Sequence, residues 1–141
     1  MTLILNILLI VIFASISILH FYWVFGGKKG LDKALPTNTN GKRIMNPSKI
    51  TTAIVAVGLF YFSFYYFLNL NVFKIALPEI LLKYTGWVIP SIFVLRAIGD
   101  FEYVGFLKKI KTSEFAKFDT TYFSPLSLII GFLGFLLQIL F

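Results

Sequence analysis

The residues that could do chemistry in this chain are few, and they lie near the ends of long apolar stretches. The single histidine, His20, could carry a proton or contact a ligand. Arg96 and Asp100 are four positions apart, so on a helix they share one face and could form an ion pair. Asp119 adds a carboxylate before the last stretch. The candidate ligand-binding residues are His20, Tyr22, Trp23, Arg96, Asp100, Asp119 and Tyr122.

Two kinds of role stay open for these residues. In the functional one, Arg96 holds an anionic group, and His20 is a general acid or base acting on a lipid-soluble substrate. In the structural one, Arg96 and Asp100 form an internal ion pair that fixes the third apolar stretch against the first. His20 is then a packed, hydrogen-bonded side chain. We assign no catalytic residue.

Four apolar stretches must position these residues, at approximately 2–25, 48–70, 80–101 and 123–141. A helix that spans a bilayer needs about 20 largely apolar residues, and each stretch has about that length. Hydrophobic residues make up 58% of the chain and charged residues only 13%, too few to solvate a soluble globule. We therefore predict an all-α integral membrane protein, a single up-and-down four-helix bundle over residues 1–141.

The basic residues predict how this bundle is oriented and what it meets. On the side of the middle loop, the only basic residues are Lys74 and Lys83, the latter near the start of the third stretch. The positive-inside rule then places the first and third loops in the cytoplasm and both termini outside. We expect the bilayer and its anionic cytoplasmic headgroups as partners, and no nucleic acid despite the net charge of +7. The basic residues of the first and third loops are Lys28, Lys29, Lys33, Lys42, Arg43, Lys49, Lys108, Lys109, Lys111 and Lys117.

Local signals predict the helix ends. Asn46-Pro47 and Ser124-Pro125 each pair an N-cap residue with a proline at the first helical position, where the second and fourth helices should begin. Leu77-Pro78-Glu79 should begin the third helix, and Gly26-Gly27 should end the first. Pro90 removes a hydrogen bond inside the third helix, so we predict a kink there. The third loop mixes apolar residues with lysines, which indicates a short element in the membrane interface.

Helical spacing predicts which faces pack. On the first stretch, Asn6, Phe13, Ser17 and His20 fall in one sector, which should face inward. On the fourth, a stripe of small and polar residues lets helix backbones approach closely. This stripe is a packing seam, either inside the bundle or between the two copies of a homodimer. Its members are Ser124, Ser127, Gly131, Gly134 and Gln138, with Ser127, Gly131 and Gly134 at its centre.

Several segments resemble those of one known family. They are His20-Phe21-Tyr22-Trp23 with Gly26-Gly27, Ala34-Leu35-Pro36-Thr37, Gly41-Lys42-Arg43, Asn46-Pro47, Ala56-Val57-Gly58-Leu59, the stretches 96–106 and 112–116, Asp119, and Tyr122-Phe123-Ser124-Pro125. The family comprises small bacterial four-span membrane proteins and is catalogued as domain of unknown function 3995. The resemblance implies a bacterial cytoplasmic (inner) membrane, and it implies no activity or catalytic residue.

Several chemistries are disfavoured by composition. There is no cysteine, which excludes disulfides and thiol redox chemistry. One histidine cannot supply two axial ligands to a haem, and no phosphate-binding glycine loop or nucleophilic triad is present. We expect neither a cofactor nor a metal ion.

Three hypotheses therefore remain, in order of preference. The first is a non-enzymatic membrane protein whose cytoplasmic mouth binds a lipid headgroup, an anionic ligand or a partner protein. The second is a small intramembrane enzyme that uses His20 and Arg96. The third is a small transporter that works as a dimer through the glycine seam.

Overall fold

The computed structural model describes residues 1–72 and 78–140, and every regular element in these ranges is helical. The long helices are α1 (Thr2–Val24), α3 (Lys49–Leu68), α4 (Glu79–Ile98) and α6 (Ser124–Leu140). The short ones are α2 (Leu31–Ala34), α5 (Glu114–Phe118) and the π-helix η1 (Asp119–Phe123), which joins α5 to α6. The predicted all-α four-helix architecture is confirmed. Lys74, Leu77 and Phe141 lie outside the described residues.

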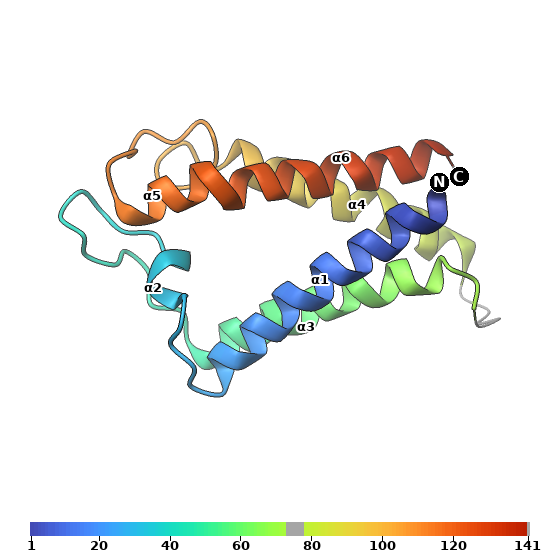
Figure 1. The fold of residues 1–141 in the computed structure, drawn as a ribbon, viewed down its shortest axis with the longest axis horizontal. Coiled ribbons are helices and arrows are strands. Elements are labelled where there is room, and N and C mark those ends of the chain that lie inside the picture. Colours follow the sequence, from blue (N-terminus) through green and yellow to red (C-terminus); the bar gives the residue numbers. More distant parts are fainter. Residues whose placement is uncertain (73–77, 141) are drawn as a thin grey trace.

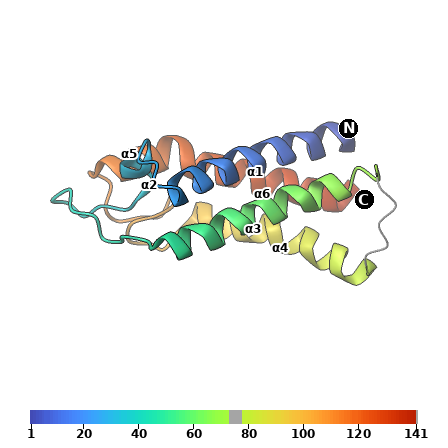
Figure 2. The same ribbon diagram turned by 90° about the horizontal axis from the view of Figure 1, so that it is seen from below.

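The bundle consists of two helical hairpins (Figures 1 and 2). One pairs α1 with α3, and the other pairs α4 with α6. The hairpins approach each other at the end that holds both termini and diverge toward the opposite end, where α2 and α5 lie (Figure 1). We call that opposite end, residues 25–49 and 99–121, the lysine-rich end. Its two loops meet, since α2 contacts α5.

Within residues 1–72 and 78–140, four helices are long and apolar enough to cross a membrane: α1, α3, α4 and the continuous run Glu114–Leu140. Their outward faces carry large apolar side chains that a soluble protein would bury. Ile4, Ile18, Ile54, Leu95 and Ile139 are each at least 66% exposed. A lipid environment accounts for these faces, because hydrocarbon solvates them without cost.

Phe13 of α1 lies at the centre of the packing between the hairpins. Its ring stacks on Tyr66 at 5.8 Å between ring centroids and makes edge contacts with Phe62 at 5.6 Å and Phe93 at 5.2 Å. These partners come from α3 and α4. Such aromatic pairs each contribute about 0.5–1.5 kcal/mol beyond their area. The predicted inward face of α1 is buried at Asn6, Phe13 and Ser17, whereas His20 is only half-buried.

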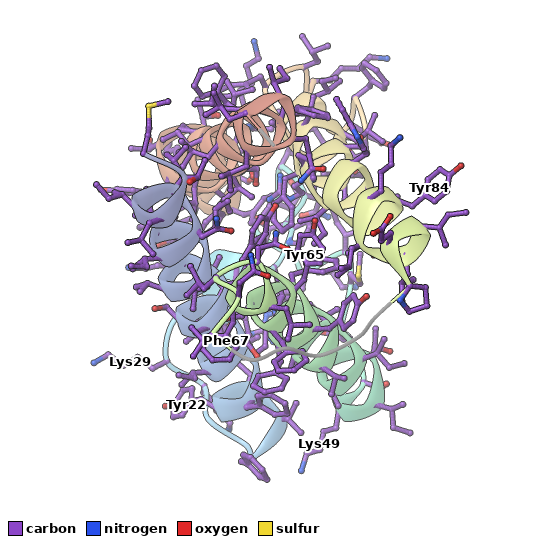
Figure 3. The ribbon with its side chains drawn as sticks, turned by 90° about the vertical axis from the view of Figure 1, so that its right-hand side faces the viewer. Tyr22, Lys29, Lys49, Tyr65, Phe67 and Tyr84 are labelled. Atoms are coloured by element: carbon purple, nitrogen blue, oxygen red, sulfur yellow. The ribbon has the colours of Figure 1, made fainter. Side chains whose placement is uncertain are left out.

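Hydroxyl groups fasten α1 to α3 inside the apolar region. Ser17 Oγ donates to the Ala56 carbonyl at 2.8 Å, and Ser63 Oγ donates to the Ile10 carbonyl at 3.1 Å. Nearer the termini, Tyr65 Oη donates to the Leu82 carbonyl of α4 at 3.0 Å. Figure 3 shows Tyr65 pointing into the space between the helices, whereas Tyr84 projects outward. These bonds satisfy polar groups that lipid could not.

The glycine seam of α6 faces α4. A methyl group on Gly134 would lie 2.8 Å from Pro90 Cβ, and one on Gly131 would lie 3.1 Å from the Pro90 carbonyl oxygen. The two glycines therefore let α6 lie against the proline-bearing face of α4. The sequence left open whether this seam packs inside the bundle or between two copies. In the structure it packs inside the bundle, against α4. Helix α4 continues through Pro90, and the kink stays a prediction.

One predicted helix start is wrong, and a second coincides with the start of α6 but is not a free, capped helix end. Helix α3 begins at Lys49, capped by Ser48, whose Oγ accepts from the Thr51 N–H, and not at Asn46-Pro47. Helix α6 begins at Ser124, as predicted, but it continues a helical run that begins at Glu114, where Ser113 Oγ accepts from the Ala116 N–H. Pro125 offers no N–H to the preceding turn, and the chain accommodates it by widening into the π-helix just before it.

The other two predicted ends agree with the described residues. Gly26 ends α1 in a left-handed conformation with φ +97°, and the Gly27 N–H donates to the Tyr22 carbonyl at 2.9 Å. Helix α4 begins at Glu79 after Pro78. The third loop contains the short helix α5, and its position in a membrane interface stays a prediction.

Candidate functional site

Asp119 is the centre of a buried polar cluster at the lysine-rich end. Its carboxylate is fully buried. One oxygen accepts from Arg96 Nη2 at 2.8 Å. The other accepts from Lys108 Nζ at 2.9 Å, from the Gly105 N–H at 2.8 Å and from Ser124 Oγ at 3.1 Å. The carboxylate thus joins α4, the third loop and α6 through charge-assisted hydrogen bonds.

The cluster carries more positive than negative charge. Arg96 and Lys108 share the single carboxylate of Asp119. Arg96 Nη1 is buried and has no hydrogen-bond partner within the described residues. The cluster therefore has one net positive charge, and because the Arg96 side chain is 32% exposed, this charge can attract an anion.

Lys108 is 2% exposed and works as a donor, not as a base. Its ammonium donates to the Gly105 carbonyl at 2.8 Å, to Asp119 at 2.9 Å and to Thr120 Oγ1 at 2.7 Å. These three acceptors use all three of its protons. A lysine held in this way is unsuited to general-base catalysis, which needs an unprotonated amine.

The predicted ion pair between Arg96 and Asp100 is wrong: Arg96 binds Asp119 instead. Helix α4 ends at Ile98, and Gly99, with φ +97°, turns the chain away before Asp100. Asp100 Oδ1 accepts from the N–H groups of Glu102, Tyr103 and Val104 at 2.7–2.9 Å. Partial burial alone would raise the pKa of Asp100, but the backbone N–H groups outweigh it and hold the pKa below its ordinary value.

The glycines around Asp100 allow this turn to close on itself. A methyl group on Gly99 would clash with the Val104 carbonyl, and one on Gly105 would clash with the Gly99 backbone. The Phe106 N–H then returns to the Ala97 carbonyl at 2.8 Å. This geometry directs the Gly105 N–H toward Asp119. The stretch 96–106 therefore contributes two donors to the cluster, the Arg96 side chain and the Gly105 N–H.

His20 lies with Trp23 at the end of α1, apart from this cluster. His20 Nδ1 lies 2.8 Å from the Ile16 carbonyl oxygen, and its ring packs edge-on against Trp23 at 4.8 Å. Trp23 Nε1 donates to the Lys29 carbonyl at 3.0 Å. Tyr22 lies beside Gly27 and is 45% exposed. Because the hairpins diverge here, the end of α1 lies away from the ends of α4 and α6 (Figure 1).

Tyr122 belongs to a small stack on the side of the π-helix. Its ring stacks on Phe118 at 5.7 Å. Lys33 Nζ of α2 lies 4.7 Å from the centroid of the Phe118 ring. This cation–π contact joins the first and third loops. Of the candidate residues, the structure brings Arg96 and Asp119 together, and it places Tyr122 on a neighbouring surface.

A pocket of about 360 Å³ opens beside the cluster, and it includes residues absent from the candidate set. It is lined by Phe106, Lys108, Lys111, Ala116, Lys117, Thr120 and Thr121. The polar side chains of this lining are cationic or hydroxylic, so it suits an anion. Lys117, Thr120 and Thr121 lie three and four positions apart on the helical run of α5 and η1, a spacing that could have drawn attention to one face. The fold of the loop around Asp119, which the spacing does not give, creates the pocket.

Among the described residues, no group of three or more His, Asp or Glu side chains is placed to hold a metal ion. Residues 13–134 match the family described as "Protein of unknown function (DUF3995)". The chain belongs to this family. The match covers the second half of α1 and all of α3 and α4, and it extends to the glycine seam of α6. The DUF3995 chain matches no curated protein and no solved structure.

Proposed function

We propose that this DUF3995 protein is a non-enzymatic component of the bacterial cytoplasmic membrane that binds anionic lipid headgroups at its lysine-rich end. In this orientation the lysine-rich end lies in the cytoplasm and both termini lie outside. The observation that carries the proposal is the convergence of the two basic loops at one end of the bundle, through contact between α2 and α5. All their basic side chains except Lys108 are exposed.

Exposed apolar side chains lie among these lysines and support the same reading. Phe25 is 85% exposed, Phe101 56% and Leu107 58%. A surface that mixes such side chains with lysines matches the headgroup region, where apolar groups enter the acyl boundary and ammonium groups meet phosphates. The excess positive charge of the Asp119 cluster adds to this attraction.

The geometry favours this role over the two alternatives. An intramembrane enzyme using His20 and Arg96 needs both at one substrate, whereas the contacts of His20 lie within α1 and Arg96 binds Asp119. A dimeric transporter needs the glycine seam at its dimer interface, whereas Gly131 and Gly134 face Pro90 of α4. These contacts therefore give no support to either alternative.

Native mass spectrometry tests the proposal directly. The full chain in neutral detergent is offered equal amounts of phosphatidylglycerol and phosphatidylcholine, and the ratio of bound lipids is measured. We expect phosphatidylglycerol to be preferred, and Lys28→Gln with Lys29→Gln to lower that preference. One lysine near an anionic surface contributes about 1 kcal/mol, or roughly fivefold in affinity.

Lys83→Gln is the control, because it removes one positive charge from the first half of α4, away from the lysine-rich end. Its lipid ratio should equal that of the unmodified protein. Equal binding of the two lipids by the unmodified chain would refute the proposal, and so would a loss in Lys83→Gln as large as that in the loop variant.

A further inference from the structure

The pocket beside α5 differs from the rest of the lysine-rich end, because it has a defined lining. Lys111 and Lys117 are exposed at its mouth, and the buried Lys108 forms part of its wall. Its volume of about 360 Å³ falls in the range of small-molecule sites. No acidic side chain lines it. Asp119, the nearest carboxylate to Lys108, accepts four hydrogen bonds behind this wall.

Thr120 gives the pocket a directed hydroxyl donor. Its Oγ1 accepts from Lys108 Nζ at 2.7 Å, which leaves its own proton for a further acceptor. A hydroxyl that accepts from an ammonium group becomes a stronger donor, because the two hydrogen bonds polarise each other. Thr121 lies beside it in the lining. The pocket therefore offers ammonium and hydroxyl donors around one space, a set that matches a group with several anionic oxygens.

From this arrangement we infer that the pocket is a binding site for a phosphomonoester, held by Lys111, Lys117 and the Thr120 hydroxyl. A phosphomonoester carries a charge of about −1.5 to −2 at pH 7 and three terminal oxygens. Two lysines and the uncompensated charge of the Asp119 cluster match that charge better than the single charge of a phosphodiester. The inference rests on the proposed function, since it names the headgroup chemistry that the lysine-rich end selects.

The remaining wall indicates what the phosphate is attached to. Phe106 and Ala116 give the pocket an apolar side, and Leu107, next to Phe106, is exposed. An apolar wall beside a phosphate site fits the glycerol and first acyl carbons of a lipid such as phosphatidic acid. A soluble phosphomonoester has the same headgroup chemistry, so the test must separate the two sources.

The test uses the full chain in neutral detergent at pH 7.5, offered equimolar phosphatidic acid and phosphatidylglycerol, with native mass spectrometry as readout. We expect phosphatidic acid to be preferred. Lys111→Gln with Lys117→Gln should lower that preference at least tenfold, because each charge-assisted hydrogen bond that is lost contributes about 1.5 kcal/mol. Thr120→Val should lower it less, and thermal unfolding should show that each variant is folded.

Lys28→Gln with Lys29→Gln is the matched control, with the same charge removed outside the pocket. It should weaken the binding of both lipids equally and leave the ratio of bound phosphatidic acid to bound phosphatidylglycerol unchanged. Two results would overturn the phosphomonoester site. One is equal binding of phosphatidic acid and phosphatidylglycerol by the unmodified protein. The other is an equal fall in the ratio of bound phosphatidic acid to phosphatidylglycerol in the two double-lysine variants. The proposed function would survive that result, and it fails separately if neither anionic lipid is preferred over phosphatidylcholine.

A soluble competitor identifies the source of the phosphate. Glycerol 3-phosphate is titrated against bound phosphatidic acid, with glycerol as the uncharged control. Displacement only at large excess supports a lipid ligand, because the apolar wall then contributes. Displacement at equal concentration supports the site with a soluble ligand. No displacement at any concentration would contradict recognition of the phosphomonoester group itself.

Discussion

Asp119 accepts hydrogen bonds from a helix, a loop backbone, a buried lysine and a serine, so much of the lysine-rich end depends on one carboxylate. The sequence identified both Arg96 and Asp119 as candidates but paired Arg96 with Asp100. The rule that residues four apart share a face holds only within a helix, and Gly99 ends α4 before Asp100. The partner 23 positions along the chain depends on the fold of the third loop, which local spacing does not encode.

At this scale, a double-mutant cycle distinguishes the two pairings. Arg96→Met and Asp119→Asn should show a coupling energy of about 1–3 kcal/mol, because they share a buried ion pair. Arg96→Met and Asp100→Asn should be nearly additive, since Asp100 binds backbone N–H groups. Thermal unfolding in detergent measures both cycles. A larger coupling with Asp100 than with Asp119 would contradict the cluster.

At the scale of helices, the sequence predicted which helices exist and which of their faces pack better than it predicted where they begin. The four long apolar stretches and the small-residue stripe of α6 follow from composition and helical period, and the structure has both. The start of α3 was misplaced and the cap of the last helical run was misassigned, because Asn-Pro and Ser-Pro match the capping pattern. Ser48 and Ser113, nearby alternatives with equal capping ability, make the actual bonds. The sequence could not show whether the seam packs within one bundle or between two copies, because that depends on where α4 lies.

The seam makes a prediction at this scale. Gly134→Ala should lower the free energy of unfolding by about 1–3 kcal/mol, because the added methyl overpacks against the rigid ring of Pro90. Gly58→Ala is the matched control, since a methyl there meets nothing within 4 Å. It should be neutral or stabilise by up to about 1 kcal/mol, as alanine favours helix. Thermal unfolding of both variants in the same detergent measures the two changes in stability. An equal loss of stability in Gly134→Ala and Gly58→Ala would contradict close packing at the seam.

At the scale of the whole molecule, two hairpins converge at the end with the termini and separate at the lysine-rich end, which contains the Asp119 cluster and the pocket (Figure 1). Charge asymmetry in the sequence predicted which loops share a face of the membrane. It could not show that α2 and α5 touch, or that Lys108 turns inward while Lys111 and Lys117 face a pocket. Those features depend on how irregular loop backbone satisfies a buried carboxylate.

Cysteine labelling in cells tests most directly whether the bundle spans the membrane with its lysine-rich end in the cytoplasm. The chain has no cysteine, so single substitutions report cleanly. Asn40→Cys places a thiol in the first loop, and Val72→Cys places one after α3, both at exposed positions. With a membrane-impermeant maleimide, we expect Val72→Cys to react in cells with a permeable outer layer and Asn40→Cys to react only in inverted vesicles. Reaction of Asn40→Cys from outside, or of both sites from one side, would contradict the account.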